Sequence, residues 1–347
     1  MKEKTFGWCF IGSGGIANKV MGDMPYTNGG YSAAVYSRTY TNACKFAEKH
    51  GAKPYRSLEE AFEDPFVKAV YVASPNSSHK EHTLLAMQHG MPVLCEKPLA
   101  VSLQDANELI RAAGEKKIYL LDGLWTRFNP VIQQVIGMVK DGRVGQVRSL
   151  SASFCIYKKY DPQARHYDPA LGAGSLLDIG IYPILFACMV FDGFPVKISA
   201  IADYTPNRVE HLISITLQYR CGAIARLFSG FSTNEPQDAC IAGTDGYFSI
   251  PYLWKAKTAR LHLLNSSEDD MILDPGFPGF GYQYMFNAAM DDILSGRTEN
   301  AVVTHDLSLQ VMTIIDQVWK CLGTGETYER KEMKKDASIE TSGLGPI

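Results

Sequence analysis

The chain has 347 residues, 46% of them hydrophobic, which is enough to bury a large core and more than one average domain needs. Its 34 lysines and arginines nearly balance 37 aspartates and glutamates, and the formal net charge of −3 argues against nucleic-acid and membrane partners. The eight cysteines are scattered, without a C-x-x-C motif or a Cys/His cluster. This predicts reduced thiols and neither a metal site nor a disulfide framework.

The apolar run at the N-terminus is interrupted by glycine after a few residues and is too short for a secretory signal. No later run approaches the apolar length expected of a membrane helix. We therefore expect a cytoplasmic protein.

Between residue 5 and about residue 122, short apolar runs alternate with stretches of helical spacing. Alternation of strand and helix requires right-handed crossovers, which produce a parallel sheet covered on both faces. The predicted strands of this first half are 5–11, 31–36, 69–73, 92–95 and 118–121.

After about residue 143 the strand-like runs become longer, and turn residues separate them instead of helices. This pattern predicts hairpins in an antiparallel or mixed sheet, and hence an α+β domain. We place the domains at residues 1–123 and 124–347, with helices at about 282–295 and 305–322 that cover this sheet or return to the first domain. The tail from about residue 330 is expected to be loosely held. The predicted strands are 147–157, 196–204, 211–219, 223–231, 247–250 and 259–264.

A glycine-rich turn joins the first predicted strand to the first helix and reads G-x-G-x-x-A. Gly12 permits the tight turn, Gly14 lets the backbone approach a diphosphate, and Ala17 keeps helix and strand close. The N-terminus of the helix offers unpaired N–H groups to the phosphates. The turn therefore predicts a dinucleotide site that includes Gly12, Ser13, Gly14, Gly15 and Ile16.

The end of the second strand carries Ser37 and Arg38, where NAD-specific sites commonly place an acidic residue. A hydroxyl and a guanidinium suit a 2′-phosphate, which arginine binds through paired hydrogen bonds. NADP is therefore the preferred cofactor and NAD the alternative. Arg38 as a solvated loop charge is the other interpretation.

Three further motifs follow in order: S-P-N-S-S-H at 74–79, E-K-P at 96–98 and D-I-G-I-Y at 178–182. With the glycine turn, they resemble those of the Gfo/Idh/MocA oxidoreductases. W-T-R-F at 125–128 and G-S-L-L at 174–177 make the dimeric dihydrodiol dehydrogenase branch the most similar. The resemblance covers about residues 5–325. It implies an α/β protein with an N-terminal Rossmann domain, a C-terminal α+β domain with a large open, mostly antiparallel sheet, and a homodimer or homotetramer.

The resemblance places Lys97 beside the nicotinamide and the substrate, and it gives Asp178 a carboxylate role. Tyr182 stands where most of the family has histidine, as in the dihydrodiol branch, where tyrosine takes the acid/base role. A phenol has a pKa near ~10, and we expect the Lys97 ammonium to lower that pKa and to stabilise alkoxide-like charge. The alternatives are that Asp178 only caps a helix and that Tyr182 only packs in the core.

Several neighbours of these residues complete the predicted site. Asn76 would contact the nicotinamide ribose, and Glu96 would contact the ribose or brace the turn. Pro98 would form a cis bond that orients Lys97. The predicted cofactor contacts further include Ser74, Pro75 and His79, although His79 could instead start the next helix. Trp125 would form a wall of the nicotinamide pocket. Arg127 would hold an oxygen of the cofactor or substrate, or form an interdomain ion pair. The substrate set comprises Lys97, Asp178, Tyr182 and Arg165, with Phe154, Tyr157, His166 and Tyr167 as further pocket candidates and Arg165 or His166 available to an anionic group.

These assignments predict hydride transfer between a nicotinamide and a secondary alcohol or ketone of a sugar, polyol or cyclic diol. One alternative is a glycosidase that uses bound NAD for transient oxidation, against which Tyr182 argues. Another is a dinucleotide-sensing regulator, against which the intact set of Lys97, Asp178 and Tyr182 argues.

Overall fold

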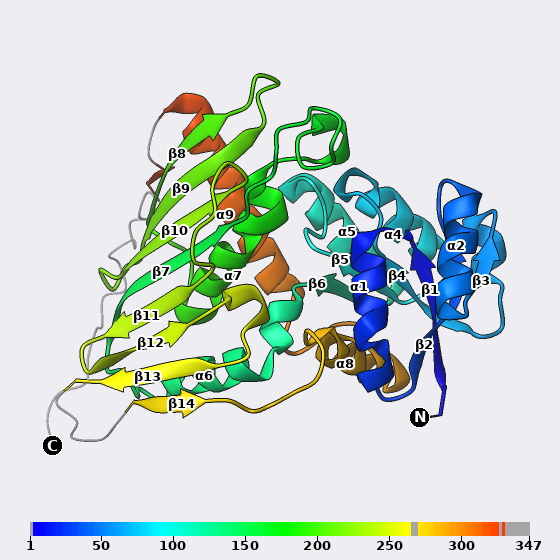
Figure 1. Ribbon diagram of the computed structural model, residues 1–347, viewed down its shortest axis with the longest axis horizontal. Coiled ribbons are helices and arrows are strands. Elements are labelled where there is room, and N and C mark those ends of the chain that lie inside the picture. The colour runs from blue at the N-terminus through cyan, green and yellow to red at the C-terminus, as the bar shows by residue number, and fades with distance from the viewer. Residues whose placement is uncertain (1–2, 265–269, 326–327, 330–347) are drawn as a thin grey trace, which may run out of the picture.

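The computed structural model describes residues 3–264, 270–325 and 328–329. Two sheets with their helices lie side by side (Figure 1). The tail from about residue 330, for which a loose attachment was predicted, lies outside the described residues.

The first sheet is parallel throughout and has six strands in the order β3-β2-β1-β4-β5-β6. This is the strand order of the Rossmann fold, so the predicted fold of the first half is confirmed. The central strand β1 is buried along its whole length, as expected when helices cover a parallel sheet. The sequence reading missed β3. The strands are β1 (Phe6–Ile11), β2 (Gly30–Tyr36), β3 (Lys53–Tyr55), β4 (Val67–Val72), β5 (Val93–Glu96) and β6 (Leu120–Gly123).

The helices of this half begin and end where short-range chemistry predicts. The hydroxyls of Ser57 and Ser102 accept backbone N–H groups at the starts of α3 and α5, and Gly51 ends α2 in the left-handed region. These helices are α1 (Gly15–Asp23), α2 (Tyr40–His50), α3 (Leu58–Phe62), α4 (His79–Gln88) and α5 (Leu103–Lys116).

The second sheet has nine strands in the order β14-β13-β12-β11-β7-β10-β9-β8-β15. Of the neighbouring pairs, β7 and β10 run parallel and the others antiparallel, so the predicted mostly antiparallel sheet is confirmed. The strands are β7 (Val147–Cys155), β8 (Lys197–Tyr204), β9 (Glu210–Gln218), β10 (Ile224–Gly230), β11 (Ala239–Gly243), β12 (Gly246–Ile250), β13 (Ala259–Leu263), β14 (Met271–Leu273) and β15 (Tyr328–Glu329).

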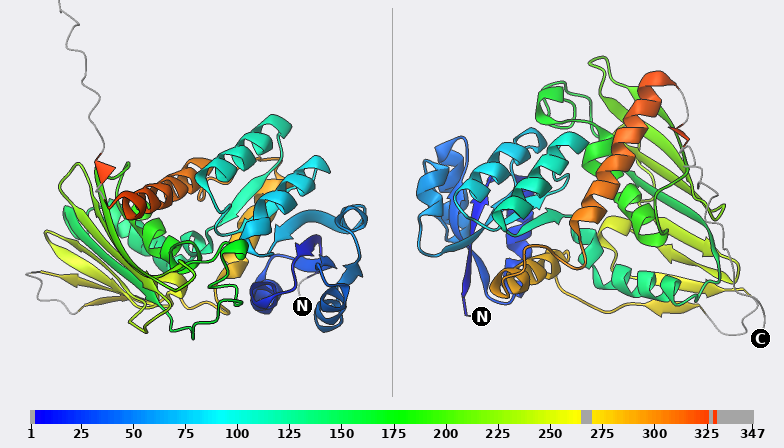
Figure 2. Two further views of the ribbon diagram at one scale, coloured as in Figure 1. Left: turned by 90° about the horizontal axis from the view of Figure 1, so that it is seen from above. Right: turned by 180° about the vertical axis from the view of Figure 1, so that it is seen from behind.

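Three helices pack on one face of this sheet: α6 (Pro130–Lys140), α7 (Ile181–Val190) and α9 (His305–Thr324) (Figure 2). The other face carries no helix among the described residues. The homodimer or homotetramer expected from the resemblance stays a prediction.

The apolar stretch Pro169–Val190 corrects one expectation, because by length and composition it could cross a membrane. In its most apolar window, however, 78% is buried inside the protein. The stretch includes α7, which is apolar on all sides because it lies in the core.

The chain returns to the first sheet near its C-terminal end through α8 (Tyr282–Leu294). Phe286 of α8 packs edge-on against Trp8 and Tyr71, with ring centroids 5.0 and 5.1 Å apart. The Asp23 carboxylate at the end of α1 accepts the backbone N–H groups of residues 280–282 and fixes the entry into α8. The domain boundary after residue 123 stays a prediction, although β6 ends there.

Candidate active site

A cavity of about 1320 Å³ extends from the carboxyl ends of β1, β2, β4 and β5 to the helix-covered side of the second sheet. Ligands of open α/β sheets gather at this edge of the strands. The predicted residues in its wall are Gly12, Ser13, Gly14, Gly15, Ile16, Ser37, Arg38, Ser74, Pro75, Asn76, His79, Glu96, Lys97, Phe154, Arg165, His166, Asp178 and Tyr182.

The glycine turn forms a cradle at one end of the cavity. Gly12 has φ +109°, and a Cβ there would lie 2.5 Å from the carbonyl oxygen of Ala73, so only glycine fits. A Cβ on Gly14 or Gly15 would meet no atom within 4 Å. This open space in front of the α1 N-terminus fits the diphosphate of a dinucleotide.

Ser37 and Arg38 lie at the same end. The Ser13 hydroxyl donates to Ser37 Oγ at 3.2 Å and links the glycine turn to the end of β2. Arg38 is exposed in the cavity wall and has no ion pair or hydrogen bond within the described chain. Lys45 and Lys49 of α2 also line this end. The sequence reading missed both lysines, which appear in it as ordinary charges of a surface helix.

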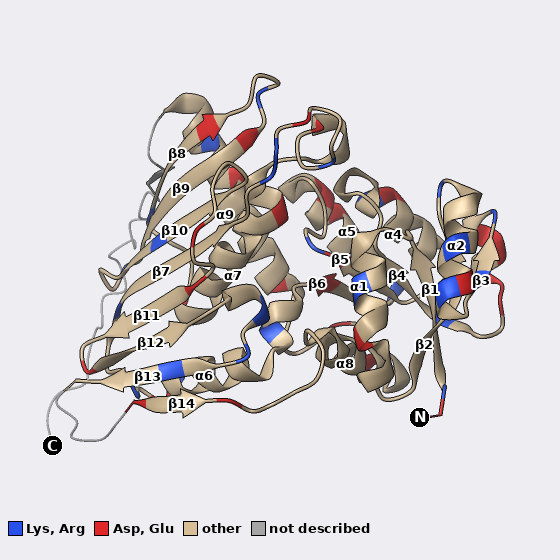
Figure 3. Ribbon diagram, viewed as in Figure 1, with Lys and Arg blue, Asp and Glu red and all other residues tan. Residues whose placement is uncertain are grey.

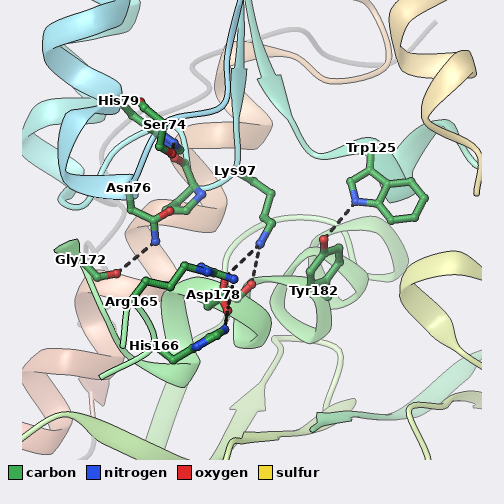
Figure 4. A network of polar contacts seen from close by, with 11 residues as sticks. Ser74, Asn76, His79, Lys97, Trp125, Arg165, His166, Gly172, Asp178 and Tyr182 are labelled. Carbon is green, nitrogen blue, oxygen red and sulfur yellow. Dashed lines mark hydrogen bonds and ion pairs between the residues drawn. The ribbon is translucent and has the colours of Figure 1, made fainter. Parts of the chain in front are cut away.

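The 74–79 motif braces the cavity through its side chains. Both ring nitrogens of the buried His79 face carbonyl oxygens, that of Pro98 at 2.7 Å and that of Ser74 at 3.0 Å. Burial lowers the pKa of His79 to about 4, although its two carbonyl contacts favour the protonated ring. Asn76 Nδ2 donates to the carbonyl of Gly172 at 3.1 Å and connects this loop to the second half (Figure 4).

Lys97 follows β5, and its peptide bond to Pro98 is cis, as predicted. Its Nζ donates to the backbone carbonyl of Asp178 at 2.6 Å and lies 3.7 Å from that residue's Oδ1 (Figure 4). It also lies over the Tyr182 ring, 5.0 Å from the centroid. Burial favours the neutral amine, but nearby groups, Tyr182 first, outweigh it and raise the pKa of Lys97. Lys97 is therefore an ammonium at neutral pH.

Asp178 lies in the π-helical turn Leu176–Gly180 that precedes α7. Its two carboxylate oxygens accept from the guanidinium of Arg165 at 3.2 and 3.3 Å, and His166 Nε2 is 3.9 Å away. Burial opposes ionisation, yet Lys97 and Arg165 lower the pKa of Asp178 below its ordinary value. Asp178 is thus an ionised link between Lys97 and Arg165.

Tyr182, one turn further along, is buried, and its Oη accepts a hydrogen bond from Trp125 Nε1 at 3.0 Å. We expected Lys97 to lower the pKa of Tyr182. The outcome is the reverse, because burial raises this pKa by more than Lys97 lowers it. Without ligand, Tyr182 is therefore a neutral phenol at neutral pH.

Trp125 and Arg127 were predicted to touch the cofactor but are not among the lining residues. Trp125 is fully buried, stacks on Tyr282 with centroids 4.2 Å apart, and supports Tyr182 from behind. Arg127 Nη1 is buried without a hydrogen-bond partner in the part of the chain described, and burial lowers the pKa of its guanidinium. Tyr157 and Tyr167 also lie outside the wall, whereas Phe231, Trp254 and Tyr282, which were not predicted, lie in it.

Glu96 is nearly inaccessible to solvent, and one carboxylate oxygen accepts from the Tyr71 hydroxyl at 2.6 Å. Burial raises its pKa. The structure thus gives Glu96 a brace at the start of the E-K-P turn. No group of three or more metal-ligating side chains occurs among residues 3–264, 270–325 and 328–329.

Comparison with protein families agrees with this fold and site. Residues 6–122 match the model of the oxidoreductase family with an NAD-binding Rossmann fold, and residues 132–249 match the Gfo/Idh/MocA C-terminal domain. The chain therefore belongs to the Gfo/Idh/MocA family and is an NAD(P)-dependent oxidoreductase.

Among curated proteins, trans-1,2-dihydrobenzene-1,2-diol dehydrogenase of Mus musculus is 32% identical over 324 residues, which are 91% of this chain and 96% of that protein. Its Danio rerio counterpart is 32% identical over 84% of this chain and 88% of its own length.

Among solved structures, the aldose-aldose oxidoreductase of Caulobacter crescentus, complexed with glycerol, has a TM-score of 0.85 and 26% identity, covering 94% of this chain and all of its own. A 3-ketoreductase of Actinomadura kijaniata, bound to NADP and TDP-benzene, has a TM-score of 0.81 and 25% identity. The similarity covers 91% of this chain and 97% of that one.

Proposed function

We propose that the protein interconverts a secondary alcohol and a ketone on a sugar, polyol or cyclic diol, with Lys97 and Tyr182 as its proton-transfer pair. The observation that carries the proposal is the meeting of Lys97, Asp178 and Tyr182 in one cavity that continues to the glycine cradle. The substrate class rests on the relatives, whose names state action on a diol, an aldose or a keto group.

The bound nicotinamide supplies the hydride in reduction and takes it up in oxidation. In reduction the Tyr182 hydroxyl gives its proton to the carbonyl oxygen as the carbonyl carbon gains hydride, which leaves an alcohol and a phenolate. In oxidation the phenolate takes the proton of the substrate hydroxyl. Lys97 stabilises the negative charge on the phenolate and on the substrate oxygen.

Trp125 orients this proton transfer. Because its indole N–H already occupies one lone pair of Tyr182 Oη, the phenolic proton is directed away from the indole. The same hydrogen bond stabilises the phenolate. Asp178 holds Lys97 through its backbone carbonyl, while Arg165 neutralises its carboxylate.

NADP is the cofactor we favour over NAD. The argument is the charge at the end of the cavity beside α2, which we call the adenosine end because the adenosine of the cofactor would lie there. Arg38, Lys45 and Lys49 line this end, and no carboxylate follows β2 to bind a ribose diol. Ser37 adds a hydroxyl beside Arg38.

The test is a spectrophotometric screen at 340 nm of diols, hexoses, inositols and their keto forms, with NADP and NAD in parallel. We expect turnover of at least one compound, and a loss of kcat of about 100-fold or more in Lys97→Met and in Tyr182→Phe with cofactor binding retained. Equal turnover by wild type and both variants would refute the assigned pair.

A further inference from the structure

The cavity differs in charge from the protein as a whole. The chain has a formal net charge of −3, yet seven lysines and arginines line the cavity against three carboxylates. Figure 3 shows basic segments on α1 and in the region between the two sheets. Lys45, Lys49 and Arg38 lie at the adenosine end. The other four cations, Lys19, Lys97, Lys158 and Arg165, belong to the rest of the cavity, where the proposed substrate lies.

The two carboxylates at this end already have partners within the protein. Asp178 is bound by Arg165 and lies next to Lys97, and Glu96 is held by the Tyr71 hydroxyl. Asp178 alone faces two cations, and even with Glu96 ionised the four cations outnumber the two carboxylates at this end.

Lys158 adds a further cation from the second half. It follows the end of β7, and its ammonium has no ion pair or hydrogen bond within the described ranges. Burial is the main cause that lowers the pKa of His166 and of Lys19. The charge of Lys158 adds to both shifts, for Lys19 after the charges of Lys255 and Lys97. Lys158 and Lys19 have no ion pair with a carboxylate within the described ranges, so the repulsion between these cations is only partly offset by Asp178 and Glu96, and a bound anion would relieve it.

The wall beside Lys158 is suited to a sugar ring. Phe154 and Trp254 stack with centroids 5.3 Å apart, and His166 packs edge-on against Phe231. All four residues line the cavity, so flat apolar surfaces lie next to the cations.

We propose that the substrate is an acidic sugar, whose carboxylate or phosphate is bound by Lys158 with Arg165 while Lys97 and Tyr182 act on a ring hydroxyl or keto group. This inference rests on the proposed function, since it places the reacting carbon at those two residues. Carboxylate and phosphate share the recognition chemistry, so the experiment must separate them.

The experiment compares glucose, glucuronate and glucose 6-phosphate as substrates of the full chain with NADP, in low and in high salt. We expect kcat/KM for one of the two anions to exceed that for glucose by about 10-fold or more, and the preference to weaken in high salt. Which anion is preferred distinguishes carboxylate from phosphate.

The variant Lys158→Gln should reduce the anion-to-glucose ratio of kcat/KM by about 10-fold. Lys159→Gln, which alters the exposed neighbour outside the cavity wall, is the matched control and should leave the ratio unchanged. Oxidation of glucose as efficient as that of both anions, or an equal loss on all three sugars in Lys158→Gln, would overturn the inference and leave the proposed function standing.

If none of the three sugars is oxidised, calorimetric titration of each sugar into the NADPH complex tests whether the cavity prefers an acidic sugar. Binding of an anion at least about 10-fold tighter than glucose supports the acidic substrate and assigns the failure to the proposed reaction. Equal binding, or no binding of any of them, overturns the inference.

Discussion

The indole N–H of Trp125 donates to the hydroxyl oxygen of Tyr182 at 3.0 Å, from a side chain with no exposed surface. Trp125 belongs to the segment after β6, and Tyr182 to the start of α7, so this contact links the connection that leaves the first sheet to a helix that packs on the second sheet, directly behind the proposed proton donor. Tyr282 stacks on the indole and continues the contact to the start of α8.

Trp125→Phe removes this donor. A hydrogen bond to a charged acceptor contributes about 1.5–3 kcal/mol, so the phenolate should become harder to form by about one pKa unit or more. We expect alcohol oxidation at pH 8 to slow by roughly 10-fold. In the Tyr182→Phe background the same change should have no additional effect on kcat, and an additional loss there would assign Trp125 a purely structural role. Thermal unfolding of each variant controls for damage to the core.

The raised pKa of Tyr182 predicts different pH profiles for reduction and oxidation. Reduction requires the neutral phenol, so its kcat/KM should stay level from neutral pH into the alkaline range. Oxidation requires the phenolate, so its kcat/KM should rise by up to about tenfold per pH unit below that pKa. Rates in both directions between pH 6 and 10 check this, and an oxidation rate that is already level at pH 7 would contradict it.

Arg38→Ala tests the adenosine end. Loss of charge-assisted hydrogen bonds to a 2′-phosphate costs about 1.5–3 kcal/mol, so the Kd for NADPH should rise roughly 10- to 100-fold while the Kd for NADH changes little. Fluorescence titration measures both. The control is Arg111→Ala, which alters an exposed arginine on α5 that pairs with Glu115. An equal loss of affinity for both cofactors would remove the argument for NADP.

Glu210 makes the stability of the protein depend on pH. Its buried carboxylate packs against Gly174, just before the π-helical turn that carries Asp178, and burial raises its pKa to about 7. The folded state therefore binds a proton that the unfolded chain has released by about pH 5, so this contribution is complete below pH 4.5 and is lost as pH rises through 7.

The corresponding variant is Glu210→Gln, which keeps the shape and cannot ionise. The free energy of unfolding of wild type should fall between pH 5 and 8 by up to about 3 kcal/mol more than that of the variant. Urea titrations at the two pH values measure the difference. Parallel pH dependence of wild type and variant would show that Glu210 remains ionised in the fold.

The repeated apolar and helical segments made much of the fold predictable. Their alternation indicated the parallel sheet, whereas β3 has only three residues, one exposed and two partly exposed, and carries little pattern. Helix α7 is apolar on every side and so has no helical periodicity.

Site residues that belong to sequence motifs were predictable, whereas those placed in the cavity only by the packing of the chain were not. Gly12 and Lys97 stand in motifs that can be recognised in the sequence. Lys158 has no such signal, and its place in the cavity follows from the turn after β7. The direction of the pKa shift of Tyr182 depends on burial, which a sequence pattern does not measure.

The packing of Phe286 on Trp8 and Tyr71 has a consequence for how the protein can be divided. A recombinant fragment that stops at residue 123 would lack this ring and would expose the indole to water. A nucleotide-binding module made from this chain must therefore retain α8, or carry polar replacements at Trp8 and Tyr71, if it is to stay in solution.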